Sequence, residues 1–328
     1  MSILKAARPY AVISNTLAIW HLFLTTLLYF GAIAIGTAFW GNIPVMIIAA
    51  LMFTGGCIRY FGAQHDCGHY AHFSNRRVNE GVGILLGAFT AHPFYAMQYN
   101  HNQHHAHIGN LNERDAHEVL TWTVAEYRAA SIWGKLFYRS YRSIPVICFF
   151  GPIFIFFFRY RIPKNVSITG WRDVIMQNAL MAALWLSVYN IGGLVAFQWF
   201  VIANVTAACL GTYMVYVGHN FEDAYWADET DVNLQEASLQ GSSVLDLGAV
   251  FHFMTYNFAF HDLHHFYVKI PAYHLKACHE AVADQLDPTR LGWRDALGCI
   301  QFKLWDEESR QMVRFADLRS PRVLYPAE

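Results

Sequence analysis

Histidines gather in three short stretches of this chain, and their spacing suits metal binding. His65 and His69 lie four residues apart in the stretch HDCGH. The stretches HNQHH and HDLHH each place three histidines at positions i, i+3 and i+4: His101, His104 and His105, and His261, His264 and His265. Residues with these spacings share one face of a helix, so each stretch directs its rings to a common point.

A ninth histidine, His219, ends a long apolar tract and joins this set as a candidate ligand. Nine imidazoles brought together would repel one another if charged, or leave ring nitrogens unpaired if neutral, unless metal ions occupy the centre. Neutral imidazole binds zinc, copper, iron and nickel, so the ligand type narrows the metal without fixing it. Because one ion offers only about four to six positions, the sequence predicts two metal ions.

Two neighbouring acids and the remaining histidines are interpreted separately. Asp66 and Asp262 each follow the first histidine of a stretch. They either fix the tautomer of a ligating ring or are solvated acids at a helix end. His107 is a candidate donor just outside the metal ligands. The other single histidines are predicted to be packing or surface residues: His21, His72, His92, His117, His252, His274 and His279.

Long tracts without charge indicate the elements that position these histidines. No charged residue lies between Arg8 and Arg59, which leaves room for two membrane-spanning helices of about 20 residues each. We expect them near residues 15–37 and 43–60, the second ending just before HDCGH. A second tract, between Asp173 and Glu222, is divided at residues 189–193 by YNIGG. The chain is therefore expected to form two membrane hairpins, at about 15–62 and 174–217.

Charge distribution sets the expected orientation. The apolar run at residues 144–158 has Lys and Arg on both sides, and cytoplasmic loops are enriched in these residues. We therefore expect this short run to lie at the membrane interface, like the run at 81–97. Four spans keep every histidine stretch on the cytoplasmic side. The predicted fold is an all-α integral membrane protein of one domain, 1–328. Residues 63–173 and 218–328 are expected to be cytoplasmic or interfacial, with a cytoplasmic helical cap from Glu222 onward.

Composition agrees with a membrane enzyme and excludes several other classes. The chain has 55% hydrophobic and 14% charged residues, where a soluble protein has roughly 25% charged. A net charge of −1 without a basic stripe argues against a nucleic-acid partner. The cysteines form no C-x-x-C pair, and the H-E-x-x-H and G-x-S-x-G motifs of hydrolases are missing. A redox task, in which two irons activate dioxygen beside an alkyl chain, fits best.

From about Arg59 to His274 the chain resembles the membrane fatty acid desaturases, which carry the boxes H-x-x-x-H, H-x-x-H-H and H-x-x-H-H. GHNFEDAYW and HDLHHFYVKIPAYHL are similar to the acyl-lipid desaturases of the delta-12 and omega-3 type. The resemblance implies a di-iron centre held by the nine histidines, with dioxygen as co-substrate. It also implies a fatty acyl substrate on a lipid, coenzyme A or acyl carrier protein. No HPGG motif occurs, so a separate ferredoxin or cytochrome b5 type donor is expected.

One departure and several alternatives stay open. In one branch of the family an Asn holds a metal-bound water where this chain has Val215, and Asn220 faces elsewhere on a helix. The same boxes support hydroxylation, acetylenic bond formation, terminal olefin formation and carotenoid oxidation. A histidine-rich metal carrier or a zinc-dependent membrane receptor is the alternative from another class. The expected location is a bacterial inner membrane.

Overall fold

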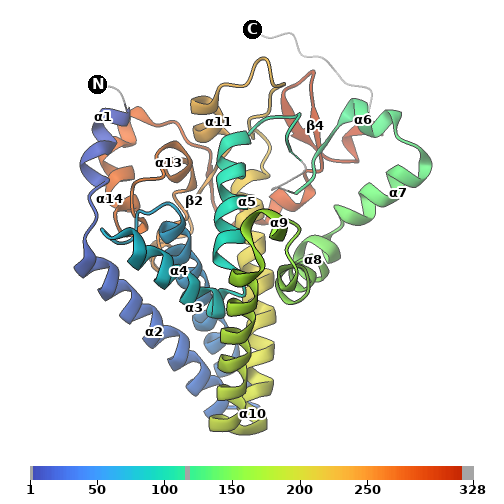
Figure 1. The fold of residues 1–328 in the computed structure, drawn as a ribbon. Coiled ribbons are helices and arrows are strands. Elements are labelled where there is room, and N and C mark those ends of the chain that lie inside the picture. Colours follow the sequence, from blue (N-terminus) through green and yellow to red (C-terminus); the bar gives the residue numbers. More distant parts are fainter. Residues whose placement is uncertain (1–2, 115–118, 320–328) are drawn as a thin grey trace.

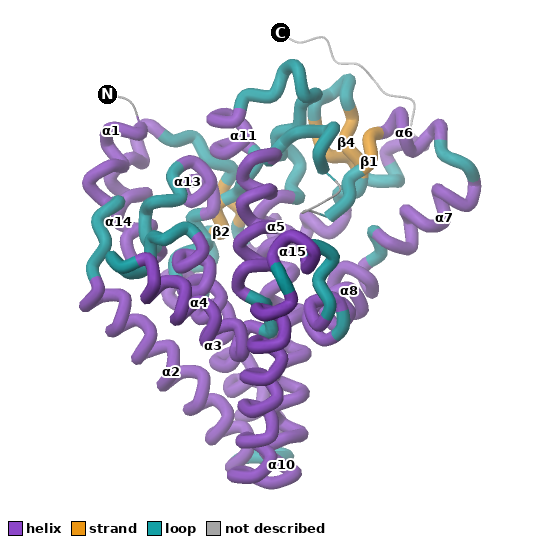
Figure 2. Tube along the Cα trace, viewed as in Figure 1, coloured by secondary structure: helices purple, strands orange, loops and turns teal. Residues whose placement is uncertain are grey.

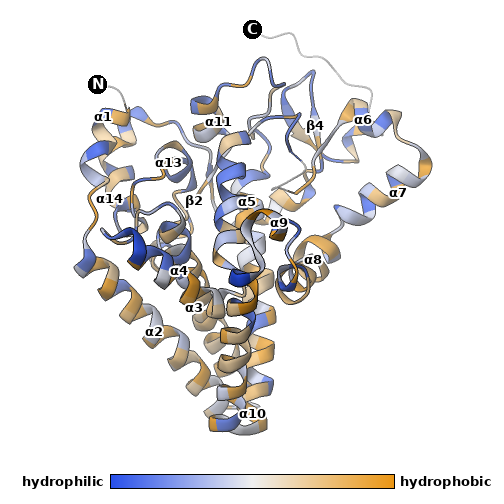
Figure 3. Cartoon of the chain, in the orientation of Figure 1, coloured by the Kyte–Doolittle hydropathy of each residue, from blue (hydrophilic) through white to orange (hydrophobic). Residues whose placement is uncertain are grey.

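Long apolar helices form the lower part of the molecule, and shorter elements cover their upper ends (Figure 1). The computed structural model describes residues 3–114 and 119–319. Four helical segments in this part of the chain are long and apolar enough to cross a membrane: Asn15–Ala38, Ile43–Gly68, Val146–Thr169 and Trp171–His219. Hydrophobic colours predominate along Asn15–Ala38 and the lower part of Trp171–His219, whereas hydrophilic colours are more frequent above them (Figure 3).

The first hairpin consists of α2 (Asn15–Ala38) and α3 (Ile43–Gly68). Side chains of Ser14 and Asn42 cap the two helices by accepting backbone N–H groups, at Leu17 and Val45. The predicted bounds of α2 are confirmed, but the predicted end of α3 near Tyr60 is wrong, because the helix continues through the first histidine stretch.

Helix α3 continues because its polar side chains are buried and paired. Gln64 donates to the carbonyls of Gly83 and His92, and it accepts from the Thr90 hydroxyl at 2.6 Å. A polar residue with partners costs little inside a protein. The loss of apolar character after Arg59 therefore marks the upper end of the membrane segment and leaves the helix intact.

The second hairpin is formed by α10 (Trp171–His219), which reverses at Gly193. Gly193 has φ 72°, a left-handed conformation that glycine adopts at little cost. The predicted division at residues 189–193 is thereby confirmed. The two arms lie side by side (Figure 1), and the ring of Trp185 on the first arm packs against Phe197 and Phe200 on the second.

Close packing joins the two hairpins. Trp199 of α10 lies against Gly36 of α2 and donates to the carbonyl of Ala32 at 3.3 Å. A Cβ atom on Gly36 would come within 1.9 Å of the Trp199 ring, so only glycine permits this approach. Tyr29 of α2 and Phe53 of α3 add a ring pair with centroids 4.5 Å apart.

The segment between the hairpins is broken into short helices. Residues 146–150 form a π-helical turn that leads into α8 (Gly151–Phe157), and a 3-10 turn at Arg159–Arg161 separates α8 from α9 (Val166–Thr169). Although its composition suits a membrane span, the helix is interrupted at Phe158, where φ is −125°. The position of this segment at the membrane interface stays a prediction.

The cap is mostly helical, as predicted, and Figure 2 shows that strands are few. Its helices are α1 (Ile3–Ala7), α4 (Arg76–Thr90), α5 (Phe94–His107), α6 (Val124–Ala129), α7 (Ile132–Tyr141), α11 (Leu234–Gln240), α12 (Ala249–Met254), α13 (His261–Phe266), α14 (Ala272–Val282) and α15 (Trp293–Gly298).

Two small sheets were not predicted. Strand β4 (Leu304–Asp306) lies between β1 (Trp122–Thr123), which is parallel to it, and β5 (Gln311–Val313), which is antiparallel. Strands β2 (Val244–Leu245) and β3 (Arg290–Leu291) form a parallel pair. Segments of two or three residues are too short to give an alternating pattern in sequence.

Candidate metal centre

Four separate elements bring the nine candidate histidines together where the cap meets the long helices. Helix α3 ends on the first pair, with His69 as its C-cap, and α10 ends on His219. The other six come from α5 and α13, which carry the second and third stretches. The second and third stretches lie within helices, and the first runs to the C-cap of α3. The prediction that each stretch directs its rings to one point is wrong for the second and third stretches, because their rings divide between two groups.

Helix α5 is fixed by an acid that the sequence analysis did not single out. Pro93 precedes the helix and supplies no side-chain cap. Instead, the carboxylate of buried Asp173 at the start of α10 accepts the backbone N–H of Tyr95 at 2.8 Å. An acid at a helix N-terminus is electrostatically favoured. Asp173 therefore couples the second hairpin to the helix that carries the second histidine stretch.

The nine side chains divide into two groups that could each hold a metal ion. The first group contains five and the second contains four: His65, His69, His101, His105 and His264, and His104, His219, His261 and His265. Within each group the candidate ligand atoms all lie within 4.8 Å of one another. The two groups do not correspond to the sequence stretches, because α5 and α13 each contribute histidines to both groups.

Distances between ring nitrogens match ligands that share an ion. In the first group the Nε2 atom of His105 lies 2.8 Å from that of His101 and 3.1 Å from that of His264. In the second group the Nε2 atoms of His219 and His261 are 2.8 Å apart. Two nitrogens bound to one ion at about 2.1 Å stand about 3 Å apart when the angle at the metal is near 90°.

Electrostatics favour the neutral rings that a metal requires. Burial, followed by the charges of neighbouring imidazoles, holds the pKa of five of these histidines well below the ordinary value: His101, His105, His261, His264 and His265. A neutral imidazole keeps a lone pair on one ring nitrogen. These rings are therefore ready to bind cations without first losing a proton.

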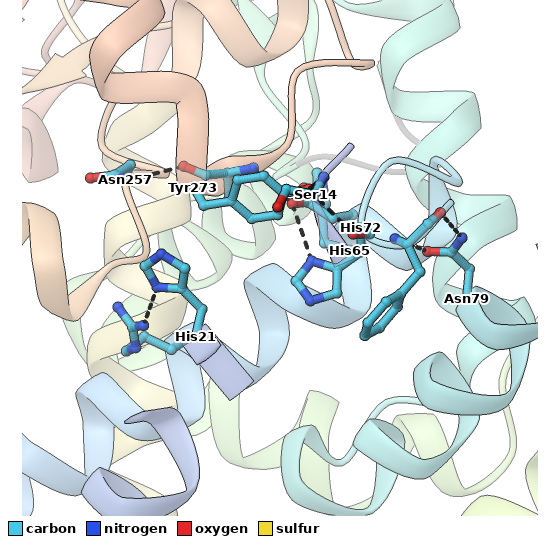
Figure 4. Close-up of polar contacts among 11 residues, drawn as sticks. Ser14, His21, His65, His72, Asn79, Asn257 and Tyr273 are labelled. Atoms are coloured by element: carbon cyan, nitrogen blue, oxygen red, sulfur yellow. Dashed lines mark hydrogen bonds and ion pairs between the residues drawn. The ribbon is translucent and has the colours of Figure 1, made fainter. Parts of the chain in front are cut away.

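Asp66 lies behind the first group. Its carboxylate is buried, 3.6 Å from Nδ1 of His65 and 3.7 Å from Nδ1 of His72, and it accepts the backbone N–H of Ala272 at 2.8 Å. Figure 4 shows His65 and His72 in this polar cluster. The interpretation of Asp66 as a solvated acid is wrong. Its position supports the alternative, an orienting carboxylate for His65.

Asp262 plays a different part. It is also buried, so the solvated interpretation is wrong here too, but the imidazole nearest its carboxylate is that of His279, with Nε2 3.7 Å from Oδ2. Burial raises the pKa of Asp262 to about 7 and lowers that of His279 to about 4. Both groups therefore favour uncharged forms, and the contact joins α13 to α14.

Replacing Asp66 with Asn should weaken metal binding about 10- to 100-fold, the usual cost of losing a partner behind a ligand. Asn keeps an oxygen for the Ala272 N–H, so the fold is retained while the negative charge beside His65 is lost. The effect is measured as the metal content of the protein after dialysis against increasing concentrations of a chelator. Glu80→Gln, a change to an acid that pairs with Arg76 away from both groups, is the control. Equal retention in both variants would contradict the orienting role.

The other histidines in the described part of the chain stay outside both groups. Nδ1 of His107 contacts the carbonyl of Gln103 in its own helix, so its predicted role beside the ligands is not supported by a contact. His92 and His252 contact the carbonyls of Thr90 and Leu245. His21 contacts Arg59, His72 lies beside Asp66, His274 is half-buried against Tyr273, and His117 lies outside the described residues.

A cavity of about 430 Å³ opens beside the histidines. His65, His101, His104, His219 and His261 line one part of its wall. Below them the wall is mainly apolar and follows the second arm of α10 from His219 down to Asn204, about 22 Å at 1.5 Å per residue. Small residues on that arm leave the space: Ala207, Ala208 and Gly211. Their spacing places them on one helical face, but in an apolar tract the same spacing is also that of ordinary helix packing.

Comparison with known proteins gives consistent matches. The family described as Fatty acid desaturase matches residues 38–296. A fatty acid desaturase of Bacillus subtilis is 30% identical over 292 residues, covering 88% of this chain and 81% of that protein. An sn-1 oleoyl-lipid 12-desaturase of Synechocystis is 26% identical and covers 80% and 76%. A fatty acid conjugase of Calendula officinalis is 23% identical and covers 82% and 78%.

Proposed function

The chain belongs to the fatty acid desaturase family, and from this premise we propose that it introduces a double bond into a fatty acyl chain at a di-iron centre, using dioxygen and two electrons. The observation that carries the proposal is the division of nine histidines into two adjacent groups beside an apolar cavity. Five and four nitrogen ligands suit two separate ions and leave room for a further small ligand on either.

The nine histidines would hold the two ions, and Asp66 would orient His65. Bound iron would supply the activation of dioxygen and the removal of hydrogen from the alkyl chain. The protein's own contribution is to keep the ligating rings neutral, to hold the alkyl chain beside them and to exclude water. The apolar wall of the cavity serves the last two purposes, because a dry site suppresses side reactions.

Partners and location follow from the same proposal. The cavity suits the acyl chain of a lipid or of a coenzyme A or acyl carrier protein thioester. The electrons would come from a separate ferredoxin or cytochrome b5 type protein. The long apolar helices would place the enzyme in a bilayer, with the histidines at its cytoplasmic face; a bacterial inner membrane remains our proposal.

Expression in a host that lacks the product tests the function. Mass spectrometry of host acyl chains should show new species two hydrogens lighter, and the purified protein should contain two iron atoms per chain. Chelation of the iron should abolish the reaction, and reconstitution with iron should restore it.

The rival activities give different outcomes in the same experiment. Products heavier by one oxygen indicate a hydroxylase, and products four hydrogens lighter indicate an acetylenic bond. Loss of the carboxyl carbon indicates terminal olefin formation, and change confined to carotenoids indicates a carotenoid oxidase. Tightly bound zinc without dioxygen consumption would contradict the proposal and favour a metal carrier or a zinc-dependent receptor.

A further inference from the structure

Two buried cations lie on neighbouring parts of the cap, because Arg142 donates to the carbonyl of Phe302 at 3.2 Å and Lys303 is the next residue. Arg142 follows α7, is 0% exposed and lines the cavity. Lys303, just before β4, is 7% exposed, and its Nζ atom has no hydrogen-bond partner. Among the described residues neither cation forms an ion pair. Burial of a charge without a counter-charge is costly.

Every group that Arg142 contacts is neutral. Its guanidinium donates to Asn220 Oδ1 at 2.6 Å, to Thr121 Oγ1 at 3.2 Å and to the hydroxyl of Tyr216 at 3.3 Å, while its Nε–H has no partner. Burial, followed by the charge of Arg142, lowers the pKa of Lys303 to about 8. The protein thus buries two cations near each other, and one of them, Arg142, lies in the wall of the cavity.

Arg59 shows how a buried arginine is accommodated elsewhere in this protein. It too donates to neutral groups, including Thr25, but its guanidinium stacks on the rings of Phe253 and Tyr256 at 4.4 and 4.9 Å. It does not line the cavity. The aromatic faces satisfy its charge in part. At Arg142 the nearest such ring, Tyr216, is 5.5 Å away.

We propose that Arg142 and Lys303 form an anion subsite for the polar end of the substrate, taking a phosphate or carboxylate oxyanion while the acyl chain lies in the apolar part of the cavity. This inference rests on the proposed function, since it assigns the polar end of the same substrate. A planar guanidinium with a free N–H suits an oxyanion, and Lys303 adds charge behind it. Histidines of both groups line the same cavity as Arg142.

Binding measurements on the full-length, iron-loaded protein in nanodiscs test the subsite without turnover. The probes are n-decyl phosphate, decanoate and decanol, which share one alkyl chain. The wild type should bind at least one of the two anions about tenfold more tightly than decanol, which is a difference of about 1.4 kcal/mol. Preference for decyl phosphate would indicate a substrate with a phosphate at its polar end, as in a phospholipid or a coenzyme A or acyl carrier protein thioester, and preference for decanoate would indicate a free carboxylate.

Lys303→Met is the first variant, because the Lys303 ammonium makes no hydrogen bond that holds the cap. Arg142→Gln is the second. Both should remove the preference for anions while leaving decanol binding unchanged, and Arg59→Gln should keep the preference. A wild type that binds all three probes equally would overturn the subsite, whatever the outcome of the desaturation assay.

An acidic residue of this chain could also supply the counter-charge for Arg142 and Lys303. Asp115 and Glu118 lie close to Thr121 in sequence but outside the described residues. The double variant Asp115→Asn with Glu118→Gln is therefore measured with the same probes. If the preference for anions appears only in this variant, the chain supplies its own anion and the proposal is wrong. An equal preference in this variant and the wild type supports it.

Discussion

Replacing His104 with Ala is expected to abolish the desaturated product while the protein still inserts into membranes. His104 lies in the second group, with its Nε2 atom 3.2 Å from that of His219 and 3.3 Å from that of His265. Because loss of an outer partner already costs about 10- to 100-fold, loss of a ligand should exceed that range. His264→Ala should act in the same way through the first group.

His107→Ala provides a matched control on the same helix. Its Nδ1 atom lies 2.9 Å from the carbonyl of Gln103, and among the described residues it belongs to neither group. Product formed by membranes of each variant is compared at equal protein content, and iron per chain is measured after purification. Full activity in His104→Ala or His264→Ala would refute the ligand role. Equal loss in His107→Ala would show that the helix, rather than the metal, had been disturbed.

The histidine stretches show how much a sequence alone can predict here. Spacings of three and four residues set which rings share a helical face, so each local cluster could be predicted from helix geometry. The division of these rings between the two groups could not be predicted in this way. His104 and His105 are neighbours in sequence yet belong to different groups, because the division depends on how α5 and α13 pack against α3 and α10.

The membrane hairpins could be predicted because charged residues are missing from long tracts. This absence extends over whole helices, so it can be seen in the sequence. The end of α3 was missed because Gln64, Asp66 and Arg59 are satisfied by residues distant in sequence, which no local pattern reveals. The same holds for Asp173, whose contact with Tyr95 links positions 78 residues apart. Composition therefore set the membrane segments, whereas tertiary contacts set the helix ends.

The walls of the cavity were beyond sequence reasoning because they combine residues from both hairpins and the cap. Gly211 illustrates the point. It lies on the second arm of α10, faces Ile58 of α3 and lines the cavity. In sequence it is one glycine in an apolar tract, where a packing role and a role in leaving space for a ligand give the same signal.

Filling this position should block the acyl chain. A Cβ atom on Gly211 would lie 3.8 Å from Cγ1 of Ile58, an ordinary contact, so Gly211→Ala should fold and remain active. In Gly211→Phe the ring would occupy the cavity below the histidines. We expect turnover of long acyl chains to fall about 100-fold, since a misfit of one methylene in an apolar pocket already costs about 10- to 200-fold.

The readout that separates blockage from misfolding is iron content together with the chain length of the products. Gly211→Phe should keep its iron, because no metal-ligand candidate is changed, and its residual products should shift toward shorter chains. Gly31→Phe is the control, since a Cβ atom on Gly31 of α2 meets nothing within 4 Å. At Gly211 the cavity passes between α3 and α10, so a phenylalanine ring there should block the acyl chain. If Gly211→Phe retained iron and processed long chains at the wild-type rate, the acyl chain would have to reach the histidines by another route.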